Sequence, residues 1–224
     1  MLATKADRDP QTGDFSADQV RRSVERSLRL LGQDRLQLVY LHDPEYASQS
    51  FEQLVGAGGA VDALLQFKLQ GVIEHVGIAS GPTELIMRYV ETDLFEVALS
   101  HNRYTLLDRS VEPLFTLAAR HNVAIVNAAP YGGGLLVTGP RAVPRYMYRP
   151  ASTALLSRAE RMAEVCDRYG VPLAAAALQF SLRDPRIAST IVGFSHPERV
   201  AQTLALATTA IPQPLWQELE ALTH

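Results

Sequence analysis

Polar side chains follow several strand-like apolar runs of this sequence, at the point where each run ends. Lys5 closes the run from Met1 to Lys5, and His42 closes the run from Leu36 to His42. A partly desolvated lysine can act as a base or lower the pKa of a neighbouring hydroxyl. A histidine can hydrogen-bond a carbonyl or move a proton near neutral pH. The alternatives for the two residues are a solvated surface amine and a cap at the start of a helix.

The same place is taken in the next runs by Ser80, His101 and Asn102. In a parallel α/β barrel the carboxyl ends of the strands converge on one face, and active sites are built on that face. A single polar residue at a strand end is common, because a loop begins there, whereas several on successive strands indicate a functional site. We therefore expect a functional site at this face.

The elements that would position these residues alternate along the chain. Most of the strand candidates are nearly continuous apolar runs, which is typical of strands covered on both faces. They are Met1 to Lys5, Leu36 to His42, His75 to Ser80, Glu96 to Asn102, Ala124 to Ala129 and Thr190 to Phe194.

Amphipathic helices are predicted between these runs. Ser16 and Gln19 have the spacing of a capping box, and Gly32 ends that helix. Its apolar face is expected to hold Val20, Val24, Leu28 and Leu31. Further helices are expected from Ala60 to Gln70, after Pro82, around Leu114, from Leu155 to Tyr169, after Pro172, and at Pro197 and Pro214. Repeated strand–helix units without a linker predict a parallel sheet wrapped by helices in one domain, residues 1–224.

The long segment from Tyr131 to Pro150 interrupts this alternation. It contains glycine, proline and arginine, and it is either a mobile surface connection or a lid over the strand ends.

Composition excludes several classes of protein. The 224 residues carry 21 Lys+Arg against 24 Asp+Glu, which leaves no basic footprint for nucleic acid or an anionic membrane. A single cysteine, Cys166, cannot form an internal disulfide. No signal peptide or membrane span is recognisable, so we expect a soluble, cytoplasmic protein.

Common catalytic motifs are absent from the sequence. It contains no Gly-x-Gly-x-x-Gly pattern, no P-loop, no His-Glu-x-x-His zinc motif and no Gly-x-Ser-x-Gly elbow. Gly132, Gly133 and Gly134 follow a strand candidate and either let a phosphate approach the backbone or permit a tight turn.

Four segments together resemble the aldo-keto reductase family. The segment Ser16 to Glu45, which ends in H-D-P-E, is similar to that family's helix and catalytic-histidine strand. The others are R-Y-T-L-L-D (Arg103 to Asp108), N-A-A-P-Y-G-G-G-L-L (Asn127 to Leu136) and I-V-G-F-S-H-P-E-R-V (Ile191 to Val200). The residues of these motifs are most similar to those of the branch that holds aldose (L-fucose-type, D-threo-aldose) and pyridoxal dehydrogenases.

The resemblance implies a (β/α)₈ barrel that binds NAD or NADP without a Rossmann fold. It implies hydride transfer between the nicotinamide and an aldehyde or lactol carbon of a sugar or small carbonyl compound. Lys5 matches the family lysine that tunes a tyrosine acid or base, and His42 matches the histidine that orients the substrate. The cofactor residues it implies are Ser80, His101, Ala129, Pro130, Tyr131, Gly132, Gly133, Gly193, Phe194, Ser195, Arg199 and Gln202.

The sequence departs from the family pattern at several of these positions. Ala79 and Ser80 replace a serine–asparagine pair near the nicotinamide amide, and Ala128 falls where many members place a stacking tyrosine. Gly193 stands where lysine is frequent and Gln202 where glutamate is common. Arg199 matches an arginine that contacts the adenosine end and, in NADP enzymes, its 2′-phosphate.

The resemblance also places the family's aspartate and tyrosine before the lysine, on the first two barrel segments. With six strand candidates, the expected fold is an incomplete (β/α)₈-type barrel that lacks these two strands. Tyr104 and Tyr131 lie near strand ends, and we expect them in the core or the pocket rather than as replacements. Activity of this chain is then expected to be impaired, and its open sheet edges favour a homodimer.

The alternative is a non-catalytic nucleotide-binding or structural barrel fragment, because the Ile191 to Val200 segment is retained. A metal-dependent hydrolase is a weaker alternative, because the sequence shows no ligand cluster.

Overall fold

The computed structural model describes residues 1–223, which form two compact units. Unit 1 comprises residues 1–100 and 113–125, and unit 2 comprises residues 101–112 and the chain from residue 126 onward. The boundary passes through two strands. That residues 1–224 form one domain stays a prediction.

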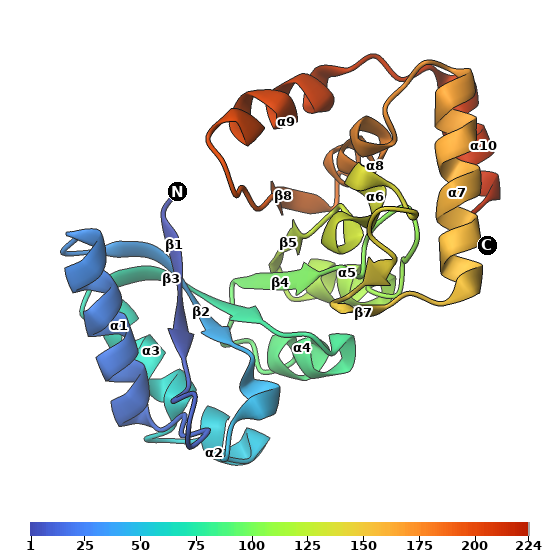
Figure 1. Ribbon diagram of the computed structural model, residues 1–224. Helices are drawn as coiled ribbons and strands as arrows, with labels where there is room; N and C mark the ends of the chain where they lie inside the picture. Colours follow the sequence, from blue (N-terminus) through green and yellow to red (C-terminus); the bar gives the residue numbers. More distant parts are fainter. Residues whose placement is uncertain (224) are drawn as a thin grey trace. The chain divides into compact units, whose positions relative to one another are not determined.

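Each of the six predicted strands overlaps a strand of the described chain, but the first continues two residues past its predicted end at Lys5, and the last ends at Ile191 instead of Phe194. They follow the order β1-β2-β3-β4-β5-β8, and β1 to β4 pair in parallel (Figure 1). Their bounds are β1 Ala3–Asp7, β2 Leu36–His42, β3 Ile73–Ala79, β4 Val97–His101, β5 Ala124–Ala128 and β8 Ile187–Ile191. Helices connect the parallel strands, as the sequence pattern predicts.

Burial differs between the inner strands and the strands at the two ends of this order. In β2 the residues from Leu38 to Leu41 are all buried, as are those from Val76 to Ala79 in β3. Only Ala6 is buried in β1, and no residue is buried in β8. The prediction of strands covered on both faces is therefore confirmed for β2 and β3 and wrong for β1 and β8, because apolar composition alone does not supply a covering layer.

The helices of unit 1 lie along its parallel strands (Figure 1). The helix α1 packs against α3 and β1, and α3 packs against β3. The short helices η1 (Pro44–Tyr46) and α2 precede α3 and were not predicted from the sequence. The bounds are α1 Ala17–Leu31, α2 Phe51–Val55, α3 Ala60–Leu69, α4 Thr83–Val90 and α5 Glu112–Arg120, of which Glu112 belongs to unit 2.

The start of α1 is capped, although not by a capping box. Ser16 Oγ accepts the Gln19 backbone N–H at 3.3 Å, but the Gln19 side chain donates to Asp7 O at 3.0 Å. The second half of the predicted box is therefore wrong, because β1 offers the Gln19 amide a carbonyl. Gly32 ends the helix in the left-handed conformation, as predicted.

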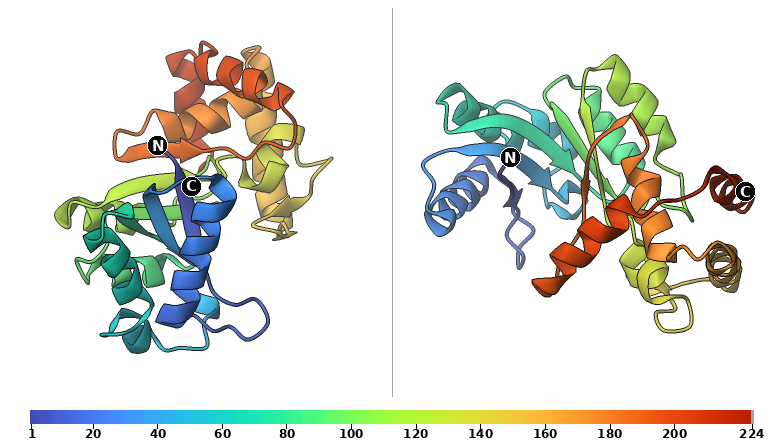
Figure 2. Two further views of the ribbon diagram at one scale, coloured as in Figure 1. Left: turned by 90° about the vertical axis from the view of Figure 1, so that its left-hand side faces the viewer. Right: turned by 90° about the horizontal axis from the view of Figure 1, so that it is seen from above.

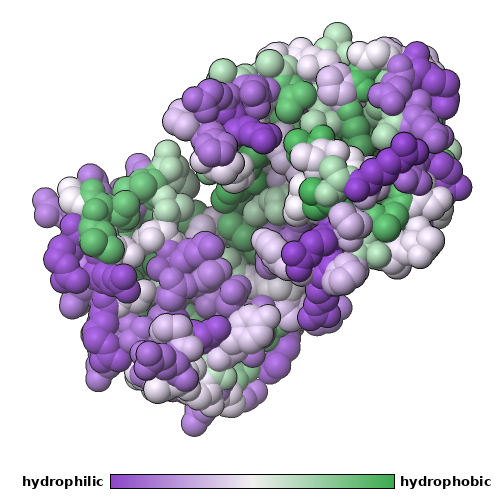
Figure 3. Space-filling model, viewed as in Figure 1, coloured by the Kyte–Doolittle hydropathy of each residue, from purple (hydrophilic) through white to green (hydrophobic). Residues whose placement is uncertain are grey.

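The apolar face of α1 is buried only in its first half. Val20 and Val24 are buried, Leu28 is half-buried, and Leu30 and Leu31 are exposed. Figure 3 shows the resulting hydrophobic surface over the C-terminal end of this helix. The expectation that Leu31 belongs to the buried face is wrong, since periodicity cannot show where the neighbouring layer stops.

The helices of unit 2 surround the alanine-rich α8. In α8 the residues from Ala174 to Leu178 are buried. The helix α7 lies beside α10 (Figures 1 and 2), where Tyr169 Oη donates to Glu218 at 2.6 Å. The bounds are α6 Leu135–Thr138, α7 Thr153–Arg168, α8 Leu173–Leu182, α9 Glu198–Thr208 and α10 Gln213–Ala221.

The segment from Tyr131 to Pro150 is folded. It contains η2 (Gly132–Gly134), α6 and a small hairpin of β6 (Arg145–Tyr146) and β7 (Arg149–Pro150). Tyr146 is buried, and its hydroxyl donates to Asn102 O at 2.6 Å and lies 2.9 Å from Thr105 Oγ1. The side chain thus anchors the hairpin inside unit 2. A lid role for this segment stays a prediction.

Among residues 1–223, no helix combines the length and apolarity needed to cross a membrane. The same residues contain no group of three or more His, Cys, Asp or Glu arranged to hold a metal ion. Cys166 is buried, and burial raises the pKa of its thiol to about 11.

Candidate functional site

Three adjacent strands of unit 1 end at the same edge of the sheet. In the parallel register Lys5 pairs with Tyr40, Asp7 with His42, and His42 with Ala79. This register places the ends of β1, β2 and β3 side by side. His42 ends β2 and Ser80 directly follows β3, as the sequence predicts, but the expectation that Lys5 ends its strand is wrong, because β1 continues for two residues to Asp7.

Lys5 and His42 are in direct contact. Lys5 Nζ lies 3.2 Å from His42 Nε2, and His42 Nδ1 lies 2.5 Å from Asp7 Oδ1. A second carboxylate, Asp43 Oδ1, lies 3.4 Å from Nε2. The four residues form a short chain of proton donors and acceptors at the strand ends.

Asp7 and Asp43 were not singled out from the sequence. Side chains of a strand alternate between its two faces, so Asp7 lies on the same face as Lys5 two residues before it. That spacing was a usable signal for Asp7. Asp43 depends on a backbone feature that the sequence does not show: its φ of 49° is left-handed, and its N–H donates to Ala79 O at 2.8 Å.

A cavity of about 930 Å³ opens beside this cluster within unit 1. Lys5, Asp7, His42 and Asp43 contribute to its wall, and α1 supplies the opposite side through residues that include Arg22 and Arg26. The side chain of His42 is 25% exposed, so it is partly accessible from this space. The cluster is thus both ordered and reachable.

Ser80 lies at the end of β3 and is only 1% exposed. Its hydroxyl donates to Glu45 Oε2 at 2.9 Å, and Gly81 N–H donates to Glu45 Oε1 at 2.8 Å. Glu45 is the last residue of the H-D-P-E motif and had no assigned role. Because the Ser80 hydrogen is directed at Glu45, only the lone pairs of Oγ remain for any other partner.

The remaining candidates lie in unit 2. His101 is half-buried at the end of β4, and its ring centroid lies 6.4 Å from that of Tyr148. Asn102 is fully buried with a left-handed φ of 59°, and its N–H donates to Ala128 O at 3.1 Å. Within residues 1–223 its side-chain amide has no hydrogen-bond partner.

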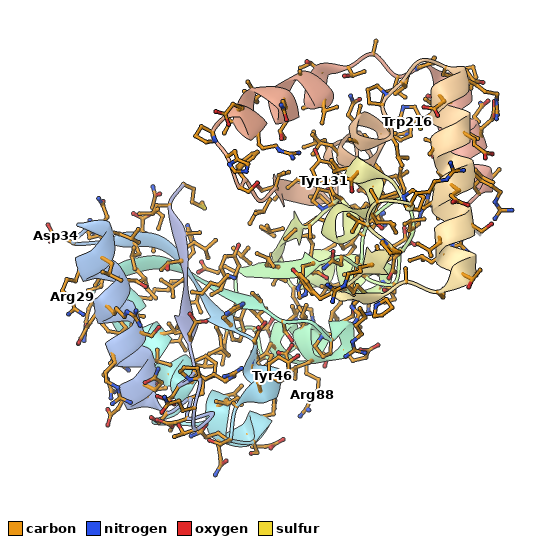
Figure 4. The ribbon with its side chains drawn as sticks, in the orientation of Figure 1. Arg29, Asp34, Tyr46, Arg88, Tyr131 and Trp216 are labelled. Atoms are coloured by element: carbon orange, nitrogen blue, oxygen red, sulfur yellow. The ribbon has the colours of Figure 1, made fainter. Side chains whose placement is uncertain are left out.

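The segment after β5 begins with a left-handed residue, Ala129, whose N–H donates to Ile191 O at 3.2 Å. Pro130 is buried, and Tyr131 follows it (Figure 4). Burial raises the pKa of Tyr131. The hydrogen bond of Ala129 to Ile191 places the start of this segment beside the end of β8 in unit 2.

The three glycines of this segment differ in their surroundings. Gly132, Gly133 and Gly134 all have positive φ, where other residues are strained. A Cβ at Gly132 would lie 2.5 Å from the Tyr146 ring, whereas a Cβ at Gly133 would meet nothing within 4 Å. The backbone at Gly133 therefore leaves open space for a ligand.

The segment from Gly193 to Gln202 is exposed along its whole length. Phe194 is 49% exposed, Ser195 and Gln202 are exposed, and a Cβ at Gly193 would meet nothing within 4 Å. No side chain caps the start of α9. The N–H groups of Arg199 and Val200 already donate to His196 O and Pro197 O, and the first turn carries Glu198 beside the positive charge of Arg199.

Tyr104 belongs to the interior of unit 2. Its hydroxyl donates to Asp184, and the Arg186 guanidinium also donates to Asp184, with Nη2 to Oδ2 at 2.6 Å. Burial raises the pKa of Tyr104 to about 12. Its ring stacks on Phe180 with the ring centroids 4.8 Å apart, so Tyr104 is held in the interior of unit 2 rather than presented at a strand end.

Comparison with known proteins identifies the chain's relatives. The profile of the Aldo/keto reductase family matches residues 1–224. The chain belongs to this family. It is 33% identical over 208 residues to D-threo-aldose 1-dehydrogenase of Pseudomonas sp, covering 92% of the chain and 62% of that protein. It is 30% identical over 214 residues to pyridoxal 4-dehydrogenase of Microbacterium luteolum, covering 93% and 63%.

The chain therefore spans a little over three fifths of the length of these two relatives. Among solved structures, it matches aldo-keto reductase AKR11C1 of Bacillus halodurans with a TM-score of 0.76 at 24% identity, covering 100% of the chain and 72% of that protein. This likeness supports the barrel-type fold expected from the sequence. The similarity to aldose and pyridoxal dehydrogenases confirms the branch indicated by the motifs.

Proposed function

We propose that this chain is an NAD(P)-dependent oxidoreductase that transfers a hydride between the nicotinamide and an aldehyde or lactol carbon of a sugar or small carbonyl compound. The observation that carries the proposal is the contact between Lys5 Nζ and His42 Nε2 at 3.2 Å, in a chain of the aldo/keto reductase family. The names of two relatives, an aldose dehydrogenase and a pyridoxal dehydrogenase, support this substrate class.

In this proposal, residues of unit 1 interact with the reacting groups of the substrate and the nicotinamide. Lys5 provides N–H donors and a positive charge, which stabilise negative charge on a substrate oxygen. His42 is held beside it by Asp7 and faces a cavity of about 930 Å³. Because the Ser80 hydroxyl donates to Glu45, Ser80 is proposed to accept from the nicotinamide amide rather than to donate.

The residues of unit 2 are proposed to bind the nucleotide. A bound NAD or NADP supplies the hydride donor or acceptor. His101 is proposed to lie near the nicotinamide and Ala129 to Gly133 along the pyrophosphate, where Gly133 leaves open space. The exposed start of α9, with Gly193, Phe194, Ser195, Arg199 and Gln202, is proposed to hold the adenosine end. We place the enzyme in the cytoplasm, because a single buried cysteine requires no oxidising compartment.

Calorimetric titration of the chain with NAD⁺ and with NADP⁺ tests the proposal directly. We expect one site per chain, and Arg199→Ala is expected to weaken NADP⁺ binding about tenfold, the size of one lost charge-assisted hydrogen bond. NAD⁺ binding, which involves no 2′-phosphate, should change less. Arg120→Ala, an exposed arginine of α5, is the matched control. If neither NAD⁺ nor NADP⁺ binds, the proposal is contradicted.

The second candidate is a nucleotide-binding protein without turnover. One observation favours it: within residues 1–223, no tyrosine hydroxyl hydrogen-bonds to Lys5 or His42. The two candidates are separated by following NAD(P)H oxidation in the presence of small aldehydes and aldoses. Nucleotide binding without oxidation supports the second candidate. Steady oxidation that Lys5→Met abolishes supports the enzyme.

A further inference from the structure

The strand register places an acidic residue directly beside the candidate catalytic histidine. We propose that Asp7 is a positioning residue, which holds His42 in the tautomer with hydrogen on Nδ1 and leaves Nε2 as a hydrogen-bond acceptor. Asp7 and His42 are register partners in the parallel pair of β1 and β2. Their contact, Nδ1 to Oδ1 at 2.5 Å, therefore follows from the backbone and not from a chance meeting of long side chains.

The two neighbours of the His42 ring select the same tautomer. An ammonium group has three donors and no acceptor, so Lys5 at 3.2 Å from Nε2 can bond only to an Nε2 that carries no hydrogen. The hydrogen of a neutral imidazole then lies on Nδ1, and the ionised carboxylate of Asp7 is an acceptor only. With this tautomer, a hydrogen-bond donor faces an acceptor at each of the two ring nitrogens of His42.

Asp43 is the rival partner of the same ring. Its Oδ1 lies 3.4 Å from Nε2 and would bond to it only if Nε2 carried a hydrogen. That arrangement would turn an Nε2–H donor toward the Lys5 ammonium, which is also a donor. The shorter contact, with Asp7, and the position of Lys5 both favour hydrogen on Nδ1.

This assignment changes what His42 offers to a substrate, a consequence that rests on the proposed function. Lys5 carries the hydrogen-bond donors of the cluster, and His42 Nε2 carries the acceptor. A substrate carbonyl oxygen would therefore be bound by Lys5, whereas a hydroxyl, such as that of a lactol, would donate to His42. From the sequence, His42 is expected to hydrogen-bond a carbonyl or to move a proton, and the first of these roles needs the opposite tautomer.

The tautomer is measured by ¹⁵N NMR of the histidine side chains, above neutral pH and without nucleotide. The chain has six histidines, and His42→Gln identifies the signals of His42 by their loss. We expect the ¹⁵N shifts of wild-type His42 to show a protonated Nδ1 and an unprotonated Nε2. Hydrogen on Nε2 in the wild-type protein overturns the proposal, whatever the variants do.

Two aspartates of the same cavity are matched controls for Asp7. In Asp7→Ala only Lys5 still favours hydrogen on Nδ1, so we expect a second population of His42, with hydrogen on Nε2, to appear beside the first. In Asp9→Ala, whose carboxylate accepts from the backbone N–H groups of Gln11 and Thr12, the His42 signals should stay as in the wild type. In Asp43→Ala they should also stay. A tautomer unchanged in Asp7→Ala, or lost in Asp43→Ala, contradicts the assignment to Asp7.

The same samples keep this inference separate from the proposed function. Backbone amide spectra of each variant show whether the fold is retained, and the wild-type measurement requires no variant. Titration with NAD⁺ or NADP⁺ is carried out afterwards. A chain that binds neither nucleotide refutes the proposed function, whereas the tautomer of His42 supports or refutes the role of Asp7 on its own.

Discussion

At the scale of single residues, the buried carboxylate of Asp184 is stabilised by a charged partner. The side chain is 8% exposed, and the Arg186 guanidinium that donates to it lowers its pKa to about 2. Because the folded-state pKa lies below the ordinary value of 3.8, the ionised form stabilises the fold at every pH above about 4. That contribution is lost as the pH falls toward about 2.

We expect the free energy of unfolding to fall by about 2 kcal/mol between about pH 4 and pH 2 because of this group. Urea unfolding at several pH values measures the slope, and Asp184→Asn should flatten it. Asp18 is the control: it pairs with Arg21 at 2.6 Å on the surface and is 76% exposed. Asp18→Asn should leave the slope as in the wild type. An unchanged slope in Asp184→Asn would contradict this origin of the acid sensitivity.

At the scale of elements, two tight contacts determine how neighbouring segments pack. Gly77 of β3 lies against Tyr40 of β2, where a Cβ would lie 2.5 Å from the ring and 3.2 Å from Val97 O. Tyr146 anchors the hairpin of β6 and β7 through its hydroxyl. Each contact predicts the effect of one substitution on stability or hydrogen exchange.

Gly77→Ala is expected to destabilise unit 1 by about 1–3 kcal/mol, because the buried Tyr40 ring must move to admit the methyl group. The control is Gly193→Ala, where the methyl group meets nothing within 4 Å and the free energy of unfolding should stay nearly constant. Chemical denaturation of the two variants provides the comparison. Equal stabilities would show that the β2–β3 contact is looser than the structure indicates.

Tyr146→Phe removes the donor to Asn102 O and leaves that buried carbonyl with one hydrogen bond fewer, at a cost of about 1 kcal/mol. We expect hydrogen exchange in residues 139–150 to accelerate, since opening of the hairpin becomes easier. Tyr148→Phe, at a side chain 72% exposed, should leave exchange unchanged. Acceleration in both variants would mean that Tyr146 is not the anchor.

At the scale of the whole molecule, the proposed nucleotide site should couple to stability. A ligand that binds only the folded chain stabilises it by about 2.7 kcal/mol at a concentration one hundred times its dissociation constant. We therefore expect the thermal midpoint to rise with NAD⁺ or NADP⁺ concentration, by differential scanning calorimetry. Arg199→Ala should reduce the rise with NADP⁺, and adenosine, which has no phosphate, should give little. A constant midpoint would contradict a folded nucleotide site.

Much of the element order follows from the sequence. Six apolar runs predicted six strands, with β2 correct at both ends, and glycines such as Gly32 and Gly170 marked helix ends. Local patterns suffice here, because strand period, helix period and left-handed caps are properties of neighbouring residues. The family resemblance likewise assigned roles to Lys5 and His42, and the match of the family profile to residues 1–224 confirms the resemblance.

Contacts between distant residues were decided by the fold. Asp7 meets His42 only through the β1–β2 register, Glu45 takes the Ser80 hydroxyl, and Gln19 turns to a carbonyl of β1 instead of closing a capping box. In each case the partner that is bound lies 12 or more residues away in the sequence. Short-range patterns cannot rank such partners, because a hydrogen bond forms with the acceptor that folding brings within reach and not with the one that spacing suggests.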